Sequence, residues 1–219
     1  MKQKDLKKLD AIIFDFDGVI FNTEPLWFKA AIKTLKKLNL PINKKITYKR
    51  TIGVHSDIVF ETLINKKLNF STLNKINKVF KKELHKIFNK KLKPFSYLKN
   101  FIKNNKAELL IVSNSEYTFI EKLLKKADLK KYFKTKNIIS CSLKIKPKPE
   151  PDGYNLAIKK LNLKKSNILV IEDSENGITA AKKAGIKNIF RFTNNNYNLS
   201  DKIKHKNIRN IKSYRELIK

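Results

Sequence analysis

The sequence is poor in cysteine, glycine and proline, and it has no long apolar run. Its single cysteine, Cys141, excludes an internal disulfide and a cysteine-rich metal site. With five glycines, six prolines and 41% hydrophobic residues, the composition is not that of a disordered or fibrous protein. No apolar stretch is long enough to span a bilayer, and the charged N-terminus precedes an apolar run too short for a signal peptide. We therefore expect a cytoplasmic protein that does not enter a membrane.

Acidic residues are also scarce, and the formal net charge is +31. Such a charge points first to nucleic-acid binding, but the lysines are spread along the whole chain. Arginine, which reads guanine and clamps phosphate, occurs only at Arg50, Arg191, Arg209 and Arg215. We expect no specific nucleic-acid partner, only weak binding that salt weakens further. A basic nucleic-acid-binding protein on an inherited scaffold remains the alternative from another class.

Short apolar runs bounded by turn residues recur along the chain and predict strands. They lie at 11–14, 109–112, 138–140, 168–171 and 188–192. Apolar residues follow helical spacing between these runs, as at Ile120, Leu123 and Leu124, and a helix at 175–184 should end at Gly185. Alternating strands and helices predict an α/β fold whose core is a doubly wound, Rossmann-like parallel sheet.

The segment 22–92 differs, because its periodicity is helical and no convincing strand interrupts it. Thr23, Glu24 and Pro25 suit a helix start, with a capping residue followed by an early proline. The apolar residues that follow the helical pattern are Trp27, Ala30, Ala31, Leu35, Leu38, Ile58, Leu63, Ile64, Val79, Leu84 and Ile87. We expect an all-helical cap domain at 22–92, inserted into an α/β catalytic core made of 1–21 and 93–219.

Two acids, Asp15 and Asp17, follow the first predicted strand. Because open α/β sheets bind ligands at the carboxyl ends of their strands, both acids should lie at a binding site. One carboxylate there can attack a substrate and hold a metal, while the other moves a proton. An EF-hand calcium loop is excluded, because its third ligand position falls on Val19. A surface turn remains an alternative for this motif taken alone.

Two further polar segments have the composition of phosphate-binding loops. Ser113 and Asn114 end a predicted strand with a hydroxyl and backbone N–H groups that can hold phosphate oxygens, although a helix cap has the same composition. Lys148 lies in a proline-stiffened loop before a helix, where it can present a fixed positive charge. Lys146 competes for that role, and one loop lysine in a lysine-rich chain carries no weight alone.

A second acid pair, Glu172 and Asp173, ends another apolar strand. Taken alone, the pair has a simpler interpretation, because Asp173 or Ser174 could cap the helix at 175–184. The four segments gain weight from their order along the chain and from their shared position at strand ends.

That order resembles the pattern of the haloacid dehalogenase-like superfamily. The matching strings are residues 15–19, 113–115, 148–154 and 171–174, and the stretch from Glu172 to Ala181 is especially specific. The resemblance covers residues from about 11 to 195. The helical insert resembles the small cap of the β-phosphoglucomutase and sugar-phosphatase branch.

The resemblance implies phosphoryl transfer supported by Mg²⁺. It assigns Asp15 as the nucleophile that forms an aspartyl phosphate, and Asp17 as the acid and base that serves the leaving group and the attacking water. Asp15, the backbone carbonyl of Asp17 and Asp173 would be the metal ligands. Glu172 would orient a metal-bound water or share the metal.

The resemblance also assigns the substrate contacts. Ser113 and the Asn114 backbone would hold phosphoryl oxygens, and Lys148 would neutralise Asp15 and the phosphate. In the cap, the loop at 51–55 resembles the substrate loop of the family, with Gly53 allowing close backbone approach. His55 would touch the organic half of the substrate, or it is simply a solvated loop histidine.

One cap position bears on the reaction type. β-Phosphoglucomutases carry a histidine where this chain has Trp27, and residues 24–27 look more like hexose- and hexitol-phosphate phosphatases. Trp27 could equally be a core residue of the cap. We expect a monomeric Mg²⁺-dependent phosphatase of small phosphorylated metabolites, in particular sugar or sugar-alcohol phosphates. A β-phosphoglucomutase-type phosphotransferase is the alternative among enzymes.

Overall fold

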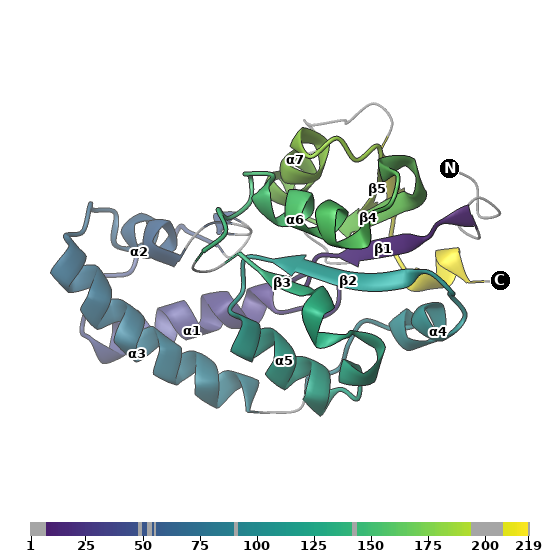
Figure 1. The fold of residues 1–219 in the computed structure, drawn as a ribbon. Coiled ribbons are helices and arrows are strands. Elements are labelled where there is room, and N and C mark those ends of the chain that lie inside the picture. The colour runs from purple at the N-terminus through teal and green to yellow at the C-terminus, as the bar shows by residue number, and fades with distance from the viewer. Residues whose placement is uncertain are drawn as a thin grey trace. The chain divides into compact units, whose positions relative to one another are not determined.

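The chain forms two units, which the computed structural model describes at residues 8–47, 50–51, 54, 56–89, 92–141, 144–193 and 208–218 (Figure 1). The first unit combines residues 1–22 with 92–219, and the second consists of residues 23–91. No helix in the described part is long and apolar enough to cross a membrane.

The first unit is built on one parallel sheet. Its strands are β1 (Ala11–Phe14), β2 (Glu108–Ser113), β3 (Ile138–Ser140), β4 (Ile168–Glu172), β5 (Asn188–Phe192) and β6 (Arg209–Ile211). They pair in parallel in the order β3-β2-β1-β4-β5-β6, which is the strand order of doubly wound Rossmann folds. The predicted fold class is therefore confirmed.

Helices cover both faces of this sheet (Figure 1). One face carries α4 (Leu98–Lys103) and α5 (Tyr117–Lys126), and the other carries α6 (Asp152–Leu161) and α7 (Glu175–Lys183). Short 3₁₀ turns complete the connections at η3 (Lys130–Tyr132), η4 (Thr135–Asn137), η5 (Lys165–Asn167) and η6 (Tyr214–Leu217). The helix predicted at 175–184 ends within one residue of its expected end, at the turn where Gly185 has a φ of +83°.

The central strands are apolar on both faces because both faces are covered. Ile13 and Val170 belong to a buried cluster with residues of α6 and α7. The neighbouring residue Phe14 points to the opposite face, where its ring centroid lies 6.3 Å from Phe101 and 5.9 Å from Phe133. This double burial explains why the strands read as short unbroken apolar runs.

The C-terminal segment adds β6 and η6, neither of which the sequence predicted. Tyr214 in η6 is wholly buried, and its ring stacks on Phe101 with centroids 5.6 Å apart. Its hydroxyl donates to the backbone oxygen of Val19 at 3.1 Å, across a separation of 195 residues. The end of the chain therefore supports the loop that follows β1.

In its described part, the second unit contains the helices α1 (Glu24–Lys37), α2 (Ser56–Ile64) and α3 (Phe70–Phe88). Helices α1 and α3 pack against each other, and Trp27 of α1 contacts Phe80 and Phe88 of α3, with centroids 5.8 Å apart in each case. Phe60 meets Phe80 edge-on at 5.1 Å. The centre of this unit is thus aromatic.

One detail of this unit corrects the sequence prediction, and a second adds to it. Pro25 lies in the first turn of α1 as expected, but Thr23 makes no side-chain capping bond, because its backbone is already helical (φ −90°, ψ −26°). Ile58 is 53% exposed, while Phe60 two residues later is buried. A helix of nine residues is too short for its apolar periodicity to fix the buried face.

Candidate active site

The candidate site begins at the carboxyl end of β1, where the sheet reverses its strand order. Strand β1 lies between β2 and β4, so the residues that follow it lie at the crevice where such sheets bind ligands. Asp15 follows β1 directly, is buried, and donates its backbone N–H to Ile171 of β4 at 2.9 Å. The fold therefore fixes the Asp15 backbone at the switch point.

A tight turn at Gly18 follows Asp17. Gly18 has a φ of +79°, which favours glycine, and its N–H donates to the Phe21 oxygen at 2.7 Å. The Asp17 carboxylate lies at the end of β2, where Oδ2 accepts hydrogen bonds from Ser115 Oγ at 2.5 Å and Ser113 Oγ at 3.4 Å. Ser115 was not assigned a role from the sequence, although the alternation Ser113-x-Ser115 offered the signal.

Lys148 lies between two carboxylates in the interior. Its Nζ is 2.6 Å from Asp15 Oδ1 and 2.5 Å from Glu172 Oε1, and its side chain is only 4% exposed. Lys146 is exposed, so these two neighbouring lysines occupy different environments. Burial lowers the pKa of Lys148, but the two carboxylates outweigh it, and the net shift is well above the usual value. The lysine therefore stays charged.

The Asn114 side chain holds the loop that carries this lysine. Its Oδ1 accepts the Lys148 backbone N–H at 2.9 Å, and its Nδ2 donates to the Lys148 backbone oxygen at 3.4 Å. The sequence had drawn attention only to the Asn114 backbone. The side chain thus links the end of β2 to the lysine loop.

Glu172, the last residue of β4, is wholly buried and accepts five hydrogen bonds. Oε1 accepts from Lys148 Nζ and from the Tyr154 hydroxyl, the latter at 3.0 Å. Oε2 accepts from Asp173 N at 3.1 Å, Ser174 N at 3.2 Å and Ser174 Oγ at 3.1 Å. A Cβ on Gly177 would lie 1.8 Å from Glu172 Oε1, so α7 can approach this carboxylate only with glycine there.

The two interpretations of the second acid pair now separate. Ser174 caps α7, because its Oγ accepts the Gly177 N–H at 3.1 Å. The helix therefore has a side-chain cap other than Asp173, which is buried beside Glu172. Oxygens of Asp15, Glu172 and Asp173 all lie within 4.8 Å of one another.

This carboxylate cluster fits a divalent cation. Carboxylate oxygens are the ligands that Mg²⁺ prefers. Three buried acids face one buried lysine, which leaves an excess of negative charge when all four groups are ionised. Burial raises the pKa of Asp15 well above its usual value, with Lys148 opposing and Glu172 and Asp17 adding to the shift. A cation would offset the repulsion among these carboxylates.

The predicted cap residues have different outcomes. Gly53 and His55 lie outside the described residues. Trp27 packs against the aromatic centre of the second unit, in keeping with its interpretation as a core residue.

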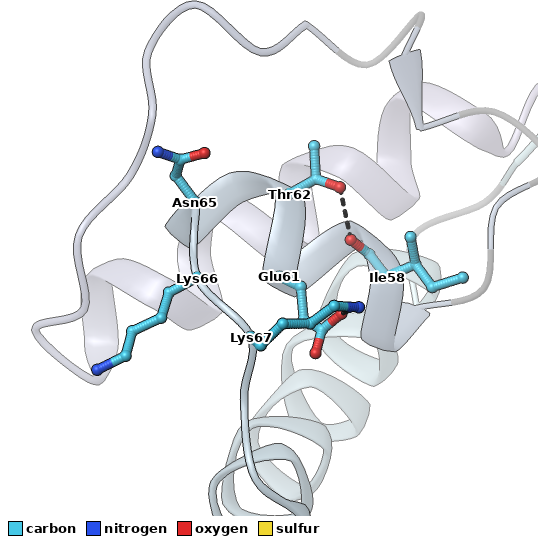
Figure 2. A pocket seen from close by; sticks show the side chains of 6 residues that line it. All are labelled: Ile58, Glu61, Thr62, Asn65, Lys66 and Lys67. Atoms are coloured by element: carbon cyan, nitrogen blue, oxygen red, sulfur yellow. Dashed lines mark hydrogen bonds and ion pairs between the residues drawn. The ribbon is translucent and has the colours of Figure 1, made fainter.

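The second unit also contains a hollow of about 340 Å³ beside α2 (Figure 2). Its lining consists of Ile58, Glu61, Thr62, Asn65, Lys66 and Lys67. Lys67 Nζ is 2.7 Å from Glu61 Oε2, so these charges largely offset each other. None of the acids at the strand ends lines it, and the catalytic candidates therefore remain those of the first unit.

Comparison with known proteins identifies the family. The family described as haloacid dehalogenase-like hydrolase matches residues 12–190. The phosphorylated carbohydrates phosphatase of Thermotoga maritima is 30% identical over 190 residues, covering 83% of this chain and 84% of the relative. Hexitol phosphatase B of Escherichia coli is 25% identical over 189 residues, covering 84% and 83%.

A solved structure agrees at the level of fold. The haloacid dehalogenase-like hydrolase of family IA, variant 3, from Entamoeba histolytica superposes with a TM-score of 0.81 at 22% identity, over 95% of each chain. The matched range includes all of the site residues, which are Asp15, Asp17, Ser113, Ser115, Lys148, Glu172 and Asp173. The chain is therefore an enzyme that belongs to the haloacid dehalogenase-like hydrolase family.

Proposed function

We propose that this enzyme is a Mg²⁺-dependent phosphatase of small phosphorylated metabolites, in particular sugar or sugar-alcohol phosphates. The observation that carries the proposal is the buried ion pair of Lys148 with Asp15 and Glu172, beside Asp173 at the switch point of the sheet. Burying three acids and a lysine is costly for stability, so a catalytic use explains the cluster better. The names of the relatives support the substrate class.

In the proposed reaction, Asp15 attacks the phosphorus of the substrate. The bond between phosphorus and the leaving oxygen breaks, and Asp17 gives its proton to that oxygen. A water then attacks the aspartyl phosphate and transfers a proton to Asp17, and the bond from phosphorus to Asp15 breaks to release inorganic phosphate. Ser115 holds the Asp17 carboxylate through its hydrogen bond to Oδ2 at 2.5 Å.

The other groups of the site manage charge. Lys148 compensates the negative charge of Asp15 and the phosphoryl group, and the Ser113 hydroxyl with the Asn114 backbone N–H would bind phosphoryl oxygens. Asp15, Asp173 and the backbone carbonyl of Asp17 would hold Mg²⁺. When bound, the cation would neutralise charge on the transferring phosphoryl group.

Glu172 and the second unit have supporting roles in this proposal. Glu172 would act through a water on the cation or share the cation. The five hydrogen bonds that its oxygens already accept favour the first of these roles. The unit at 23–91 would supply substrate specificity as a helical cap, with Gly53 and His55 as candidate contacts to the organic part of the substrate.

The test is phosphate release from a panel of phosphate esters, with Mg²⁺ and with a chelator. The panel contains sugar phosphates, polyol phosphates, phosphoglycolate and nucleotides. We expect Mg²⁺-dependent release, fastest from sugar or polyol phosphates. Release that persists undiminished in the chelator, or no release from any ester, would refute the proposal.

Trp27 makes the distinction from a mutase testable. Indole has one N–H donor and no ring nitrogen that accepts a proton near neutral pH, and here the ring packs among phenylalanines. Water should therefore discharge the aspartyl phosphate. With β-glucose 1-phosphate, Mg²⁺ and a trace of glucose 1,6-bisphosphate, we expect free phosphate and no glucose 6-phosphate. Sustained formation of glucose 6-phosphate would establish the mutase instead.

A further inference from the structure

Tyr154 is a buried group that the proposed mechanism does not use. It lies in the first turns of α6, is wholly buried, and belongs to the apolar cluster between that helix and the sheet. A phenylalanine would provide the same ring for packing. A buried hydroxyl, by contrast, costs free energy unless it has a hydrogen-bond partner. The hydroxyl therefore needs an explanation beyond packing.

Its partner is a side chain of the candidate site. The Tyr154 hydroxyl donates to Glu172 Oε1 at 3.0 Å, and the same oxygen accepts from Lys148 Nζ. Lys148 Nζ also lies 5.3 Å from the centre of the Tyr154 ring, within cation–π range. One tyrosine thus contacts the buried carboxylate through its hydroxyl and the buried lysine through its ring.

These contacts matter because lysine has a flexible stem. An ammonium group on four carbons is a mobile point charge and needs neighbours that fix its position. Glu172 is such a neighbour, and three donors from Asp173 and Ser174 hold its other oxygen. Without the tyrosine hydroxyl, Lys148 would be the one remaining donor to Oε1 among the residues that the structure describes.

We infer that Tyr154 is a positioning residue, which acts through Glu172 to hold Lys148 against Asp15. The inference rests on the proposed function for its catalytic consequence, but not for the contacts themselves. It predicts that removing the hydroxyl oxygen of Tyr154 slows the chemical step and loosens the acid cluster. Substrate binding through the other groups should be unaffected.

The test compares Tyr154→Phe with a control of similar packing cost. Ile139→Val removes one methylene from the same apolar cluster and no polar atom. We expect Tyr154→Phe to lower kcat about tenfold with KM within about twofold, and to weaken inhibition by vanadate in parallel, since vanadate mimics the transition state. Ile139→Val should change none of these. Equal kcat values for wild type and Tyr154→Phe would overturn the inference.

A second readout does not depend on turnover. Calorimetric titration with Mg²⁺ should give a dissociation constant at least about threefold higher for Tyr154→Phe than for wild type, and an unchanged one for Ile139→Val. If wild type released no phosphate but this difference held, the phosphatase proposal would fail and the positioning role would stand. Unchanged Mg²⁺ binding in Tyr154→Phe would refute the role.

A double-mutant cycle tests the route of action. If Tyr154 acts through Glu172, its replacement by Phe should have little effect on Mg²⁺ binding once Glu172→Gln is present. Equal effects in both backgrounds would show that the tyrosine acts by another path. Circular dichroism and thermal unfolding of every variant identify any that fail to fold, and Glu172→Gln alone keeps the inference testable if the double variant is unstable. In that case, the inference would be refuted if Glu172→Gln weakened Mg²⁺ binding less than Tyr154→Phe does.

Discussion

Each unit contains a cluster of three lysine and acidic side chains, and the two clusters differ in how much water reaches them. In the first unit, Lys148 has a side chain 4% exposed and lies between Asp15 and Glu172. In the second unit, Glu83 lies between Lys37 and Lys86, at 3.3 and 3.2 Å, and these lysine side chains are 55% and 66% exposed. The same types of ion pair thus occur in two different environments.

Exposure to water determines how strongly the charges of each cluster interact. The exposed lysines of the second unit are screened, so their pairs with Glu83 add little to the packing of α1 on α3. The buried cluster is strong but costs desolvation, and it contributes no clear stability. What it provides is a set of charges held away from water, which would favour the proposed phosphoryl transfer. The comparison supports our proposal that the chemistry takes place in the first unit.

Removing the proposed nucleophile should have the largest effect. Asp15→Asn should lower phosphate release at least about a thousandfold, because an amide does not form the acyl phosphate. The circular dichroism spectrum should stay that of the wild type. Activity near wild type in a well-folded variant would rule out Asp15 as the nucleophile.

Removing one lysine from each cluster should lower the free energy of unfolding by very different amounts. Lys148→Ala leaves Asp15 and Glu172 buried without the lysine ammonium group. It should lower the free energy of unfolding by about 3–5 kcal/mol and should also abolish activity. Lys86→Ala should cost less than about 1 kcal/mol and leave activity unchanged. Urea unfolding and phosphate release measure both. Similar losses for the two variants would contradict the comparison.

Two glycines offer a finer test, Gly177 within α7 and Gly185 just after its end. Gly177→Ala places a methyl group against the Glu172 carboxylate and should cost about 2–3 kcal/mol by overpacking. Activity should also fall at least tenfold, which corresponds to an increase of roughly 1.4 kcal/mol in the activation free energy. Gly185→Ala meets only the flexible end of Lys165 and should cost about 1 kcal/mol through its positive φ, with activity retained. If Gly177→Ala kept full activity, Glu172 would not need its present position.

The last prediction changes no residue and no activity, and it concerns the thiol in the apolar cluster of the first unit. Cys141 is buried in the apolar cluster, and burial raises the pKa of its thiol to about 11, with Lys148 opposing the shift. At pH 8 the native thiol should react with a disulfide reagent at least about a hundredfold more slowly than the thiol in urea. Equal rates would show that water reaches the cluster freely.

Most of the sheet could be predicted because its strands are buried on both faces. Burial on both faces makes a strand almost wholly apolar, and such runs stand out in a lysine-rich chain. Strand β6 was missed because Arg209-Asn210-Ile211 is short, mainly polar and at the sheet edge. Its assignment depends on pairing with β5, which local sequence does not reveal.

The residues at the strand ends could also be predicted, but not the contacts among them. The order of acids, hydroxyl and lysine along the chain indicated one site. The bonds from Ser115 to Asp17 and from Tyr154 to Glu172 join segments that are 98 and 18 residues apart, and they depend on side-chain rotamers. Gly177 likewise looked like an ordinary helix residue until the neighbouring carboxylate was located.

The hydrogen bond from Tyr214 to Val19 has a consequence for synthesis of the chain. Strand β1 and the loop with Asp17 leave the ribosome before Tyr214, because they precede it in the chain. The loop therefore lacks this contact until Tyr214 has been made, because this donor lies 195 residues downstream. A product that terminates before Tyr214 keeps every proposed catalytic residue but loses the buried hydroxyl that supports their loop. Translation as far as Tyr214 is thus a condition for the full support of this loop.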